Sequence, residues 1–200
     1  MRLLLFTLLI SSTMAMQAKP PRLLFVGNGL TYTNNLPELV KLEFKNRDIK
    51  VKTKMLANLN YELKDHWEKG ELQKLIKSGK FDYVIIQQGP SSQGKERQTL
   101  LHCGNLISRL CKQSNTKLVY LMVWPSRSYY HTFDEVIDSH KDAAKMSNAE
   151  LCPVGEVWKK HFDETGDFGY YGNDGYYPSI RGSQIAASVI ADHLSEMAIH

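Results

Sequence analysis

The stretch RLLFVGNGLTYTNNLP, residues 22–37, decides the fold of this chain. It begins with a short apolar run, typical of a buried strand, that ends at Gly27. Helical spacing of apolar residues follows over residues 36–47. A strand, a glycine-containing turn and a helix in this order predict the start of a parallel α/β fold. Ligands in such folds bind beyond the carboxyl ends of the strands, so the turn Gly27-Asn28-Gly29 is the first place to look for a site.

The same alternation of strand and helix continues along the chain. Ile49–Met55 alternates apolar residues with lysines, which predicts an edge strand protected from aggregation. Buried strands are predicted over Phe81–Gln88 and Lys117–Trp124, followed by a short one over Ala149–Val154. The expected helices cover residues 36–47, 62–79, 95–114, 132–147 and 155–165, with a last one that Ser179 caps and that ends near Met197. This order predicts a parallel sheet with helices on both faces, in a single domain over residues 19–200.

The first residues differ in character from the rest of the chain. Arg2 precedes the apolar run Leu3–Ile10, and Thr13-Met14-Ala15 offers a small-x-small cleavage pattern, with Ala18 as an alternative. The apolar run is much shorter than the ~20 residues that a membrane span needs. Residues 1–18 are therefore predicted to be a secretory signal peptide, with a retained anchor as the less favoured alternative. The mature protein is expected in the periplasm or outside the cell, without a stable membrane span.

Charge and cysteine usage exclude several classes of protein. Of 200 residues, 25 are basic and 21 acidic, and the basic ones are spread out, which gives no nucleic-acid footprint. Cys103 and Cys111 fall on one expected helix ~12 Å apart, beyond disulfide reach. Either one could pair with Cys152, although three buried free thiols are the favoured interpretation. The sequence has no Cys-x-x-Cys or histidine-spaced ligand pattern, so neither a metal nor another cofactor is predicted.

One interpretation of the turn after the first strand is a dinucleotide-binding fingerprint, Gly-x-Gly-x-x-Gly. Its third glycine would fall at Tyr32, and no acidic residue follows the second strand, where Lys54-Met55-Leu56 stands. The sequence therefore gives little support to nucleotide binding.

Several segments instead resemble the SGNH (GDSL-like) hydrolases, in the same order and with similar spacing. The resemblance is to the branch that reads G-N-S-x-T-Y, then N-x-L-P, and later L-x-x-H-W and D-G-x-H-P-S. The matching segments are Gly27–Tyr32, Asn34–Pro37, Leu63–Trp67, Tyr83–Gln87 and Asp174–Ser179. The resemblance covers nearly all of the expected mature chain. It implies a three-layer α/β/α sandwich with a five-stranded parallel sheet in flavodoxin-like order, and an ancestry among enzymes that hydrolyse ester bonds.

Two catalytic positions depart from that family. The resemblance places the nucleophilic serine at Gly29 and the base histidine at Tyr177, and leaves only Asp174, which would orient the histidine. Glycine has no side chain with which to attack, and a phenol with a pKa of ~10 is a poor base near neutral pH. Loss of either member typically lowers turnover by roughly 10⁴–10⁶-fold. The paired loss predicts a scaffold that no longer catalyses hydrolysis.

Candidate binding residues surround the altered positions, and they are Asn28, Gly29, Gln87, Trp124, Tyr176 and Tyr177. Gln87 matches a glutamine of the family and would either donate a hydrogen bond to a ligand or satisfy a neighbouring backbone group. Asn60 stands near the position where the resemblance implies a glycine of the oxyanion-binding site. The aromatic residues of the last loop could stack on a sugar, but packing of that loop against the sheet is the favoured interpretation.

Other residues could in principle restore a catalytic site. Thr31 is the nearest hydroxyl to Gly29, but it would need an adjacent base. His131 and His140 lie in or near a predicted helix, and His66 matches a family position of structural role. Each histidine is therefore more readily explained as a structural residue than as a base.

Two functional hypotheses from different classes follow. The first is a non-catalytic, pseudo-hydrolase protein that binds a small molecule or a glycan in the ancestral cleft. The second is an active esterase or carbohydrate O-deacetylase with a rearranged site, which the retained surroundings favour. Those surroundings are Asn28, Gln87, Asp174 and Pro178.

Overall fold

Five parallel strands form a single sheet in the computed structural model, which describes residues 19–199. The expected signal peptide, residues 1–18, lies outside the described part. The strands are β1 (Arg22–Gly27), β2 (Lys52–Ala57), β3 (Tyr83–Ile86), β4 (Lys117–Leu121) and β5 (Glu150–Cys152). Their order across the sheet is β2-β1-β3-β4-β5, and each neighbouring pair is parallel. This is the flavodoxin-like order, whose direction reverses between β1 and β3, so the predicted fold class is confirmed.

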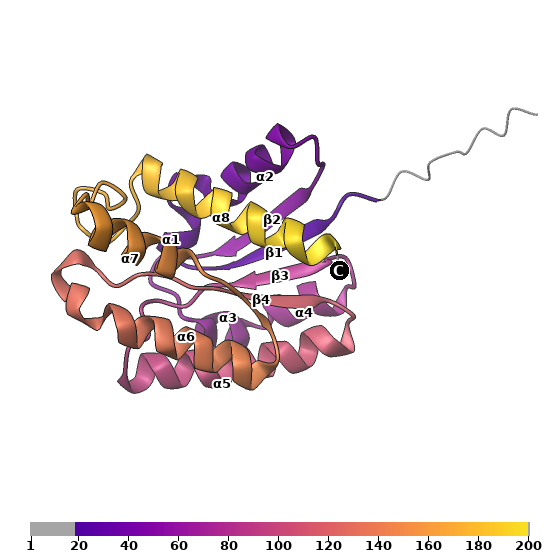
Figure 1. Cartoon of the computed structure of the whole chain (residues 1–200). Coiled ribbons are helices and arrows are strands. Elements are labelled where there is room, and N and C mark those ends of the chain that lie inside the picture. The colour runs from indigo at the N-terminus through magenta and orange to yellow at the C-terminus, as the bar shows by residue number, and fades with distance from the viewer. Residues whose placement is uncertain (1–18, 200) are drawn as a thin grey trace, which may run out of the picture.

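Helices cover both faces of the sheet (Figure 1). Figure 1 shows α2 and α8 on one face and α3, α4 and α5 on the other. The helices and 3₁₀ turns are α1 (Gly29–Tyr32), η1 (Thr33–Asn35), α2 (Leu36–Asn46), α3 (Leu63–Lys69), α4 (Glu71–Lys77), α5 (Gly94–Gln113), η2 (Arg127–Thr132), α6 (Phe133–Ser147), α7 (Val154–Thr165) and α8 (Ile180–Ile199). Across residues 19–199, none of these helices combines the length and the apolar character that crossing a bilayer requires.

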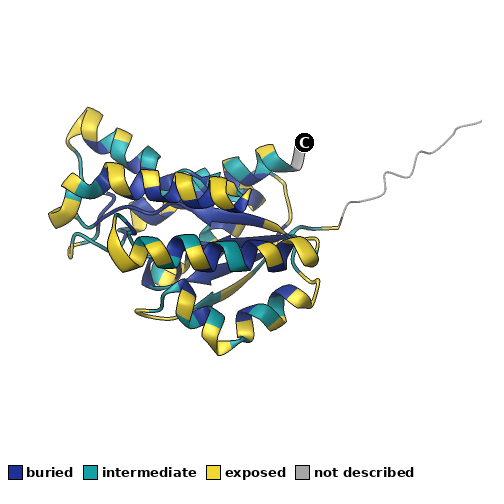
Figure 2. Cartoon of the chain, turned by 90° about the horizontal axis from the view of Figure 1, so that it is seen from below, coloured by how far each residue is buried: buried dark blue, intermediate teal, exposed yellow. Residues whose placement is uncertain are grey.

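The two core layers come from the alternation of side chains along the strands. In β1, Leu23 and Phe25 pack with α2, α7 and α8, whereas Leu24 and Val26 pack with α3, α4 and α5. Successive residues of a strand point to opposite faces, so a sheet covered on both sides needs an unbroken apolar run. The helices need only one apolar side each, and Figure 2 shows them buried toward the sheet and exposed on the outside.

Some element boundaries differ from those predicted. The predicted edge strand Ile49–Met55 is observed as β2, which begins only at Lys52. The delay has a local cause, because Asp48 adopts a φ of 58° and Ile49 donates its N–H to the carbonyl of Phe44, 2.9 Å away, at the end of α2. β3 and β4 are likewise shorter than the predicted strands Phe81–Gln88 and Lys117–Trp124, because their ladders end at Ile86 and Leu121. β2 is at the edge of the sheet, as expected.

The three cysteines are free and buried. Cys103 and Cys111 on α5 belong to the core layer on one face of the sheet, and Cys152 at the end of β5 belongs to the other layer. The sheet therefore separates Cys152 from the two others, and the alternative of a disulfide is excluded. Burial raises the pKa of Cys111 to about 12, so this thiol stays protonated and unreactive near neutral pH.

The imidazole of His140, on α6, is deeply buried. It is 1% exposed, and its Nδ1 lies 2.7 Å from the carbonyl oxygen of Val136, one turn earlier. Its Nε2 has no partner among the described residues. Burial lowers the pKa of His140 from 6.5 to about 4, because the charged ring would lose its hydration. The ring is therefore neutral in the folded protein at neutral pH.

Protonation of His140 should destabilise the fold under mildly acidic conditions. His140 takes up a proton near pH 6.5 in the unfolded chain, but only near pH 4 in the folded chain. Neutral His140 makes its full contribution to the free energy of unfolding above pH 6.5, the pKa in the unfolded chain. This contribution, worth about 3 kcal/mol, is lost as the pH falls from 6.5 to about 4. Urea unfolding of wild type and His140→Leu across this range should give a markedly shallower pH slope for the variant. A His131→Gln variant is the control, because that side chain is exposed, and equal slopes in wild type and His140→Leu would contradict the prediction.

Candidate functional site

A cleft of about 280 Å³ opens beyond the carboxyl ends of β1 and β3, where the strand order reverses. It is lined by Asn28, Asn60, Tyr61, Glu62, Gln88, Gly89, Pro90, Glu96, Tyr176 and Tyr177. Asn28, Tyr176 and Tyr177 were expected to bind a ligand from the sequence, and the fold brings these three together here. Gly29 lies buried beside them, whereas Gln87 and Trp124 do not line the cleft.

Tyr177 occupies the space that a side chain at position 29 would need. A Cβ atom on Gly29 would lie 2.5 Å from Cε1 and 2.9 Å from the hydroxyl oxygen of Tyr177. Real Cβ atoms do not approach other atoms so closely, so a side chain at residue 29 would require the tyrosine ring to shift. The two departures from the SGNH motifs are thus in direct contact, although 148 residues separate them in the sequence (177 minus 29).

The phenol of Tyr177 is a weak acid in this position. Burial is the largest cause, and with the nearby Tyr32 and Asp174 it raises the pKa of Tyr177 above its ordinary value of 10.0. The hydroxyl is therefore protonated near neutral pH and cannot take a proton from another group. It can only donate or accept a hydrogen bond.

Asp174 holds the backbone of its own loop. Its Oδ1 accepts hydrogen bonds from the backbone N–H groups of Tyr176, 2.8 Å away, and of Tyr177, 2.9 Å away. This is the pattern in which a short acidic side chain stabilises a turn. No side-chain donor is bonded to Asp174 in the described part of the chain, so its observed role is to shape the loop that places Tyr177.

Asn28 fixes the turn after β1. Its Oδ1 caps α1 by accepting from the N–H of Leu30 at 3.1 Å, and its Nδ2 donates to the carbonyl of Tyr61 at 3.1 Å. An asparagine at this position satisfies an otherwise unpaired N–H of the helix and ties the turn to the loop after β2. Asn28 therefore forms part of the cleft wall, with both atoms of its amide already bonded.

Gln87 is a structural residue, which corrects its assignment as a ligand-binding residue. It is 1% exposed, and its Oε1 accepts from the N–H of Asn28 at 2.9 Å and from the hydroxyl of Thr31 at 2.8 Å. Its Nε2 donates to the carbonyl of Gln88 at 2.8 Å. Of the two roles left open by the sequence, the structure thus assigns the satisfaction of neighbouring groups.

Gln88 is the glutamine that faces the cleft. It is 1% exposed, and its Oε1 accepts from the N–H of Leu63 at 2.8 Å. This bond orients the carboxamide, and its Nε2 has no hydrogen-bond partner within residues 19–199. Side-chain alternation is the signal that distinguishes the two glutamines, because adjacent residues at a strand end point to different sides. The sequence motif alone favoured Gln87.

Asn60 lines the cleft with its backbone in the left-handed region, at φ 59°. That conformation is the one that glycine adopts freely and that asparagine tolerates better than most residues. The conformation is therefore one that suits a glycine, the residue that the resemblance implies near this position.

Trp124 belongs to the core, which corrects its assignment to the binding site. It is 3% exposed and stacks on Trp158, with ring centroids 3.5 Å apart and an interplanar angle of 11°. Its Nε1 donates to the carbonyl of Tyr176 at 3.0 Å and so supports the last loop from below. Tyr170 and Tyr171 are also buried, which agrees with the favoured interpretation that most aromatic residues of this loop pack against the sheet.

The other candidate catalytic groups are engaged elsewhere. The hydroxyl of Thr31 is buried and bonded to the amide oxygen of Gln87, which is not a base. The Nε2 of His66 lies 2.7 Å from the carbonyl oxygen of Gly27, and burial lowers the pKa of this imidazole. His140 is enclosed within α6 and its neighbours. No cluster of three or more metal-ligating side chains occurs among residues 19–199.

Comparison with known proteins identifies the fold. No protein-family model matches the sequence, and a search of curated proteins gives no match. A presumed SGNH hydrolase from Slackia heliotrinireducens superposes with a TM-score of 0.74 at 21% identity, over 88% of this chain and 100% of that one. The lipase/acylhydrolase from Enterococcus faecalis gives 0.73 at 12% identity, over 88% and 96% of the two chains. A catalytic mutant of an acetylxylan esterase from Geobacillus stearothermophilus gives 0.65 at 14%, over 87% and 94%. The chain thus has the SGNH-hydrolase fold that its motifs predicted.

The contact between Gly29 and Tyr177 can be tested by stability measurements. Gly29→Ala in the wild-type chain should lower the free energy of unfolding by about 1 kcal/mol, the lower end of overpacking costs, because the ring can swing partly aside. In a Tyr177→Ala background the same change should be neutral or stabilising by up to about 1 kcal/mol, because alanine is the better helix former. Urea unfolding of the four chains measures this coupling, and equal effects in both backgrounds would refute the contact.

Proposed function

We propose that this chain is a catalytically degenerate member of the SGNH-type scaffold that binds a small molecule or glycan in the cleft beside Tyr177. The observation that carries the proposal is the position of the Tyr177 ring. It stands where a nucleophile on residue 29 would stand, at 2.5 Å from a Cβ placed there. Hydrolysis through a covalent acyl intermediate needs a nucleophile next to a base. On this proposal, the contact between Gly29 and the Tyr177 ring stands in place of both the nucleophile and the base.

Other observations support the absence of a substitute mechanism. Thr31 is bonded to an amide oxygen, and Asp174 is bonded to backbone N–H groups. The described residues provide no three-residue metal-ligand cluster that would activate a water molecule. A rearranged serine-type mechanism would therefore need a nucleophile and a base from groups that are already bonded to the fold.

The cleft retains the features of a binding site. It has polar groups in Asn28, Gln88 and Glu62, and the phenolic rings of Tyr61, Tyr176 and Tyr177. Small-molecule sites combine apolar or aromatic walls with a few fixed polar groups. A sugar ring, with an apolar face and hydroxyl groups at its edge, suits this combination.

Export is part of the same proposal. The charged residue, the short apolar run and the small residues near position 15 have the order of a signal peptide. A periplasmic or secreted binding protein would meet glycans and other small molecules outside the cytoplasm.

Esterase activity is the competing function, since several solved proteins of this fold are named as esterases and lipases. On the proposal, wild type shows no turnover of short-chain acyl esters above that of Tyr177→Phe or Thr31→Val, which lack the candidate hydroxyls. A fluorophosphonate probe, read by intact mass, should leave wild type unlabelled. The Gly29→Ser/Tyr177→His double variant should be labelled, because it restores a hydroxyl and an imidazole in contact.

The matched control is Gly29→Ala/Tyr177→His, which differs from the double variant by a single oxygen atom and should stay unlabelled. Wild-type turnover that disappears in Tyr177→Phe or Thr31→Val would contradict the proposal and favour the esterase. A double variant that remains inert would show that the cleft has lost more than these two groups.

Export predicts processing of the chain in a bacterial host. The protein recovered from the periplasm or medium should begin after Ala15 or Ala18, as judged by intact mass. Leu8→Arg, which places a charge in the apolar run, should keep the unprocessed chain in the cytoplasm. Full-length protein in the membrane fraction would instead support the retained anchor.

A further inference from the structure

The cleft carries negative charge without a compensating cation in its lining. Glu62, just before α3, and Glu96, in the first turn of α5, both contribute to it. Among the described residues that line the cleft there is no lysine, arginine or histidine. The charge is local, because the chain as a whole has a net charge of +4.

Neither carboxylate has an ion-pair partner in the described part of the chain, unlike many others on this surface. Asp142 is paired with Arg97 at 2.5 Å, and Glu156 with Lys141 at 2.6 Å. Pairing of surface carboxylates is common along the helices, yet Glu62 and Glu96 lie at the mouth of a concave site without a cationic partner in the described part of the chain. The Glu62 carboxylate accepts from the backbone N–H of Asp65 in the capping box of α3, which leaves its charge uncompensated. Focusing of the field by the walls of a cleft strengthens the attraction of such charges for a cation.

Independent features of the cleft point to a ligand with a polar edge and a flat face. Gln88 is 1% exposed and lines the cleft with an Nε2 group that has no partner within residues 19–199. Its Oε1 is held by the N–H of Leu63, and Nε2 is not among the fully enclosed atoms that lack a partner, so this donor is open to an acceptor in the cleft. The rings of Tyr61, Tyr176 and Tyr177 offer aromatic faces, which also attract cations.

Tyr61 already meets a cation outside the cleft lining. Nζ of Lys69 lies 5.8 Å from the centroid of the Tyr61 ring. The Tyr61 ring therefore already has a lysine over it, and Tyr176 and Tyr177 are the other aromatic rings of the cleft lining.

We propose that the cleft selects a ligand that carries a positively charged amino group on a hydroxyl-bearing ring, with an amino sugar as the simplest example. The amine would lie toward Glu62 and Glu96, a ligand oxygen would accept from Nε2 of Gln88, and the ring would lie against Tyr176 or Tyr61. This inference rests on the proposed binding function and adds the charge of the ligand. Binding forms no covalent bond, and the amine stays protonated.

Three matched probes test the inference by isothermal titration calorimetry at one fixed pH of about 6. They are short oligomers of glucosamine, the same oligomers of N-acetylglucosamine, and oligomers of galacturonic acid. The glucosamine oligomer should bind at least about tenfold more tightly than its acetylated form, and the acidic oligomer most weakly. Added salt should weaken the binding of the glucosamine oligomer but not that of the acetylated one, since salt screens exposed charges.

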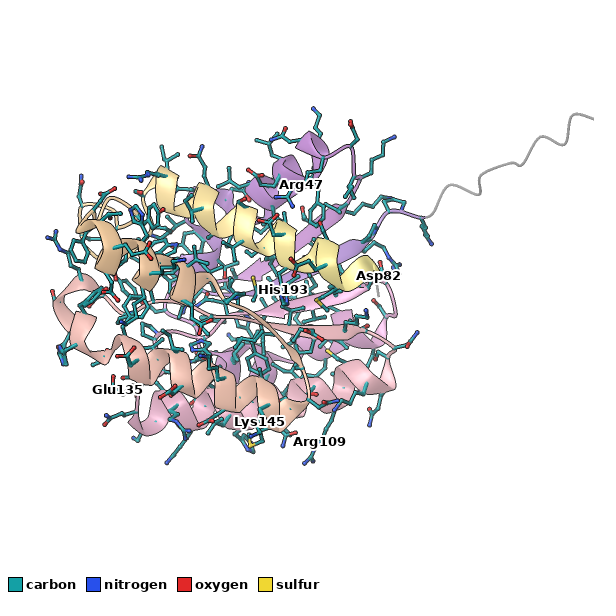
Figure 3. All side chains as sticks on the ribbon, viewed as in Figure 1. Arg47, Asp82, Arg109, Glu135, Lys145 and His193 are labelled. Carbon is teal, nitrogen blue, oxygen red and sulfur yellow. The ribbon has the colours of Figure 1, made fainter. Side chains whose placement is uncertain are left out.

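Variants that remove one carboxylate charge each test whether Glu62 and Glu96 cause the preference for the amine. Glu62→Gln and Glu96→Gln should each weaken glucosamine binding by about two- to fivefold, the scale of an exposed ion pair, and leave the acetylated probe unchanged. Their combination should remove most of the difference between these two probes. Glu135→Gln is the control, because Glu135 is an exposed carboxylate on α6 that does not line the cleft (Figure 3).

The possible results separate this inference from the proposed function. Equal binding of the amine and its acetylated form, with both lost in Tyr176→Ala, would overturn the charge selection and leave the binding function standing. Failure of all three probes to bind would overturn the amino-sugar assignment. Ester turnover by the wild-type chain would overturn the proposed function, whatever the sugars do.

Discussion

The side-chain amide of Gln87 joins the two strands between which the sheet reverses its order. At the end of β3 it accepts hydrogen bonds from the N–H of Asn28 and the hydroxyl of Thr31, and donates to the carbonyl of Gln88. A buried amide whose hydrogen bonds are made is far less costly than one left unpaired, so these bonds hold the turn after β1 in one geometry. Gly27 must be a glycine for the same reason, because a Cβ there would collide with Thr31 and Gln87. The shape of the cleft floor follows from this junction.

The junction also explains how the turn after β1 keeps its shape with a glycine at position 29. None of the groups that fix the turn is a side chain at that position. Asn28 caps α1, Gln87 binds the turn from below, and His66 contacts the carbonyl of Gly27. These bonds involve no side chain at position 29, and the ring of Tyr177 occupies the space beside Gly29. The two substitutions are therefore coupled by packing, and a side chain cannot return to position 29 without movement of the ring.

The fold was predictable from the sequence to a greater extent than the site. Apolar runs and helical spacing set the order of the elements, because both faces of a parallel sheet must be buried. The motifs placed Gly29, Tyr177 and Asp174 in one region, although only the structure reveals that Gly29 and Tyr177 touch. The sequence could not decide between the binding site and the core for Gln87 and Trp124, because where a strand ends a polar or aromatic side chain can turn either to the ligand or to the core. That choice depends on partners such as Thr31 and Trp158, which are distant in the sequence.

The negative charge of the cleft bears both on ester hydrolysis and on the choice of ligand. Ester hydrolysis develops negative charge on the carbonyl oxygen, and catalysts stabilise it with N–H donors or cations aimed at that atom. Two carboxylates without a cationic partner, in a lining of described residues that includes no basic one, oppose such charge, because like charges raise the energy of an oxyanion placed near them. The same carboxylates lower the energy of a bound cation. A cleft of this sign is therefore poorly matched to the transition state of its fold relatives and better matched to a stable, positively charged ligand.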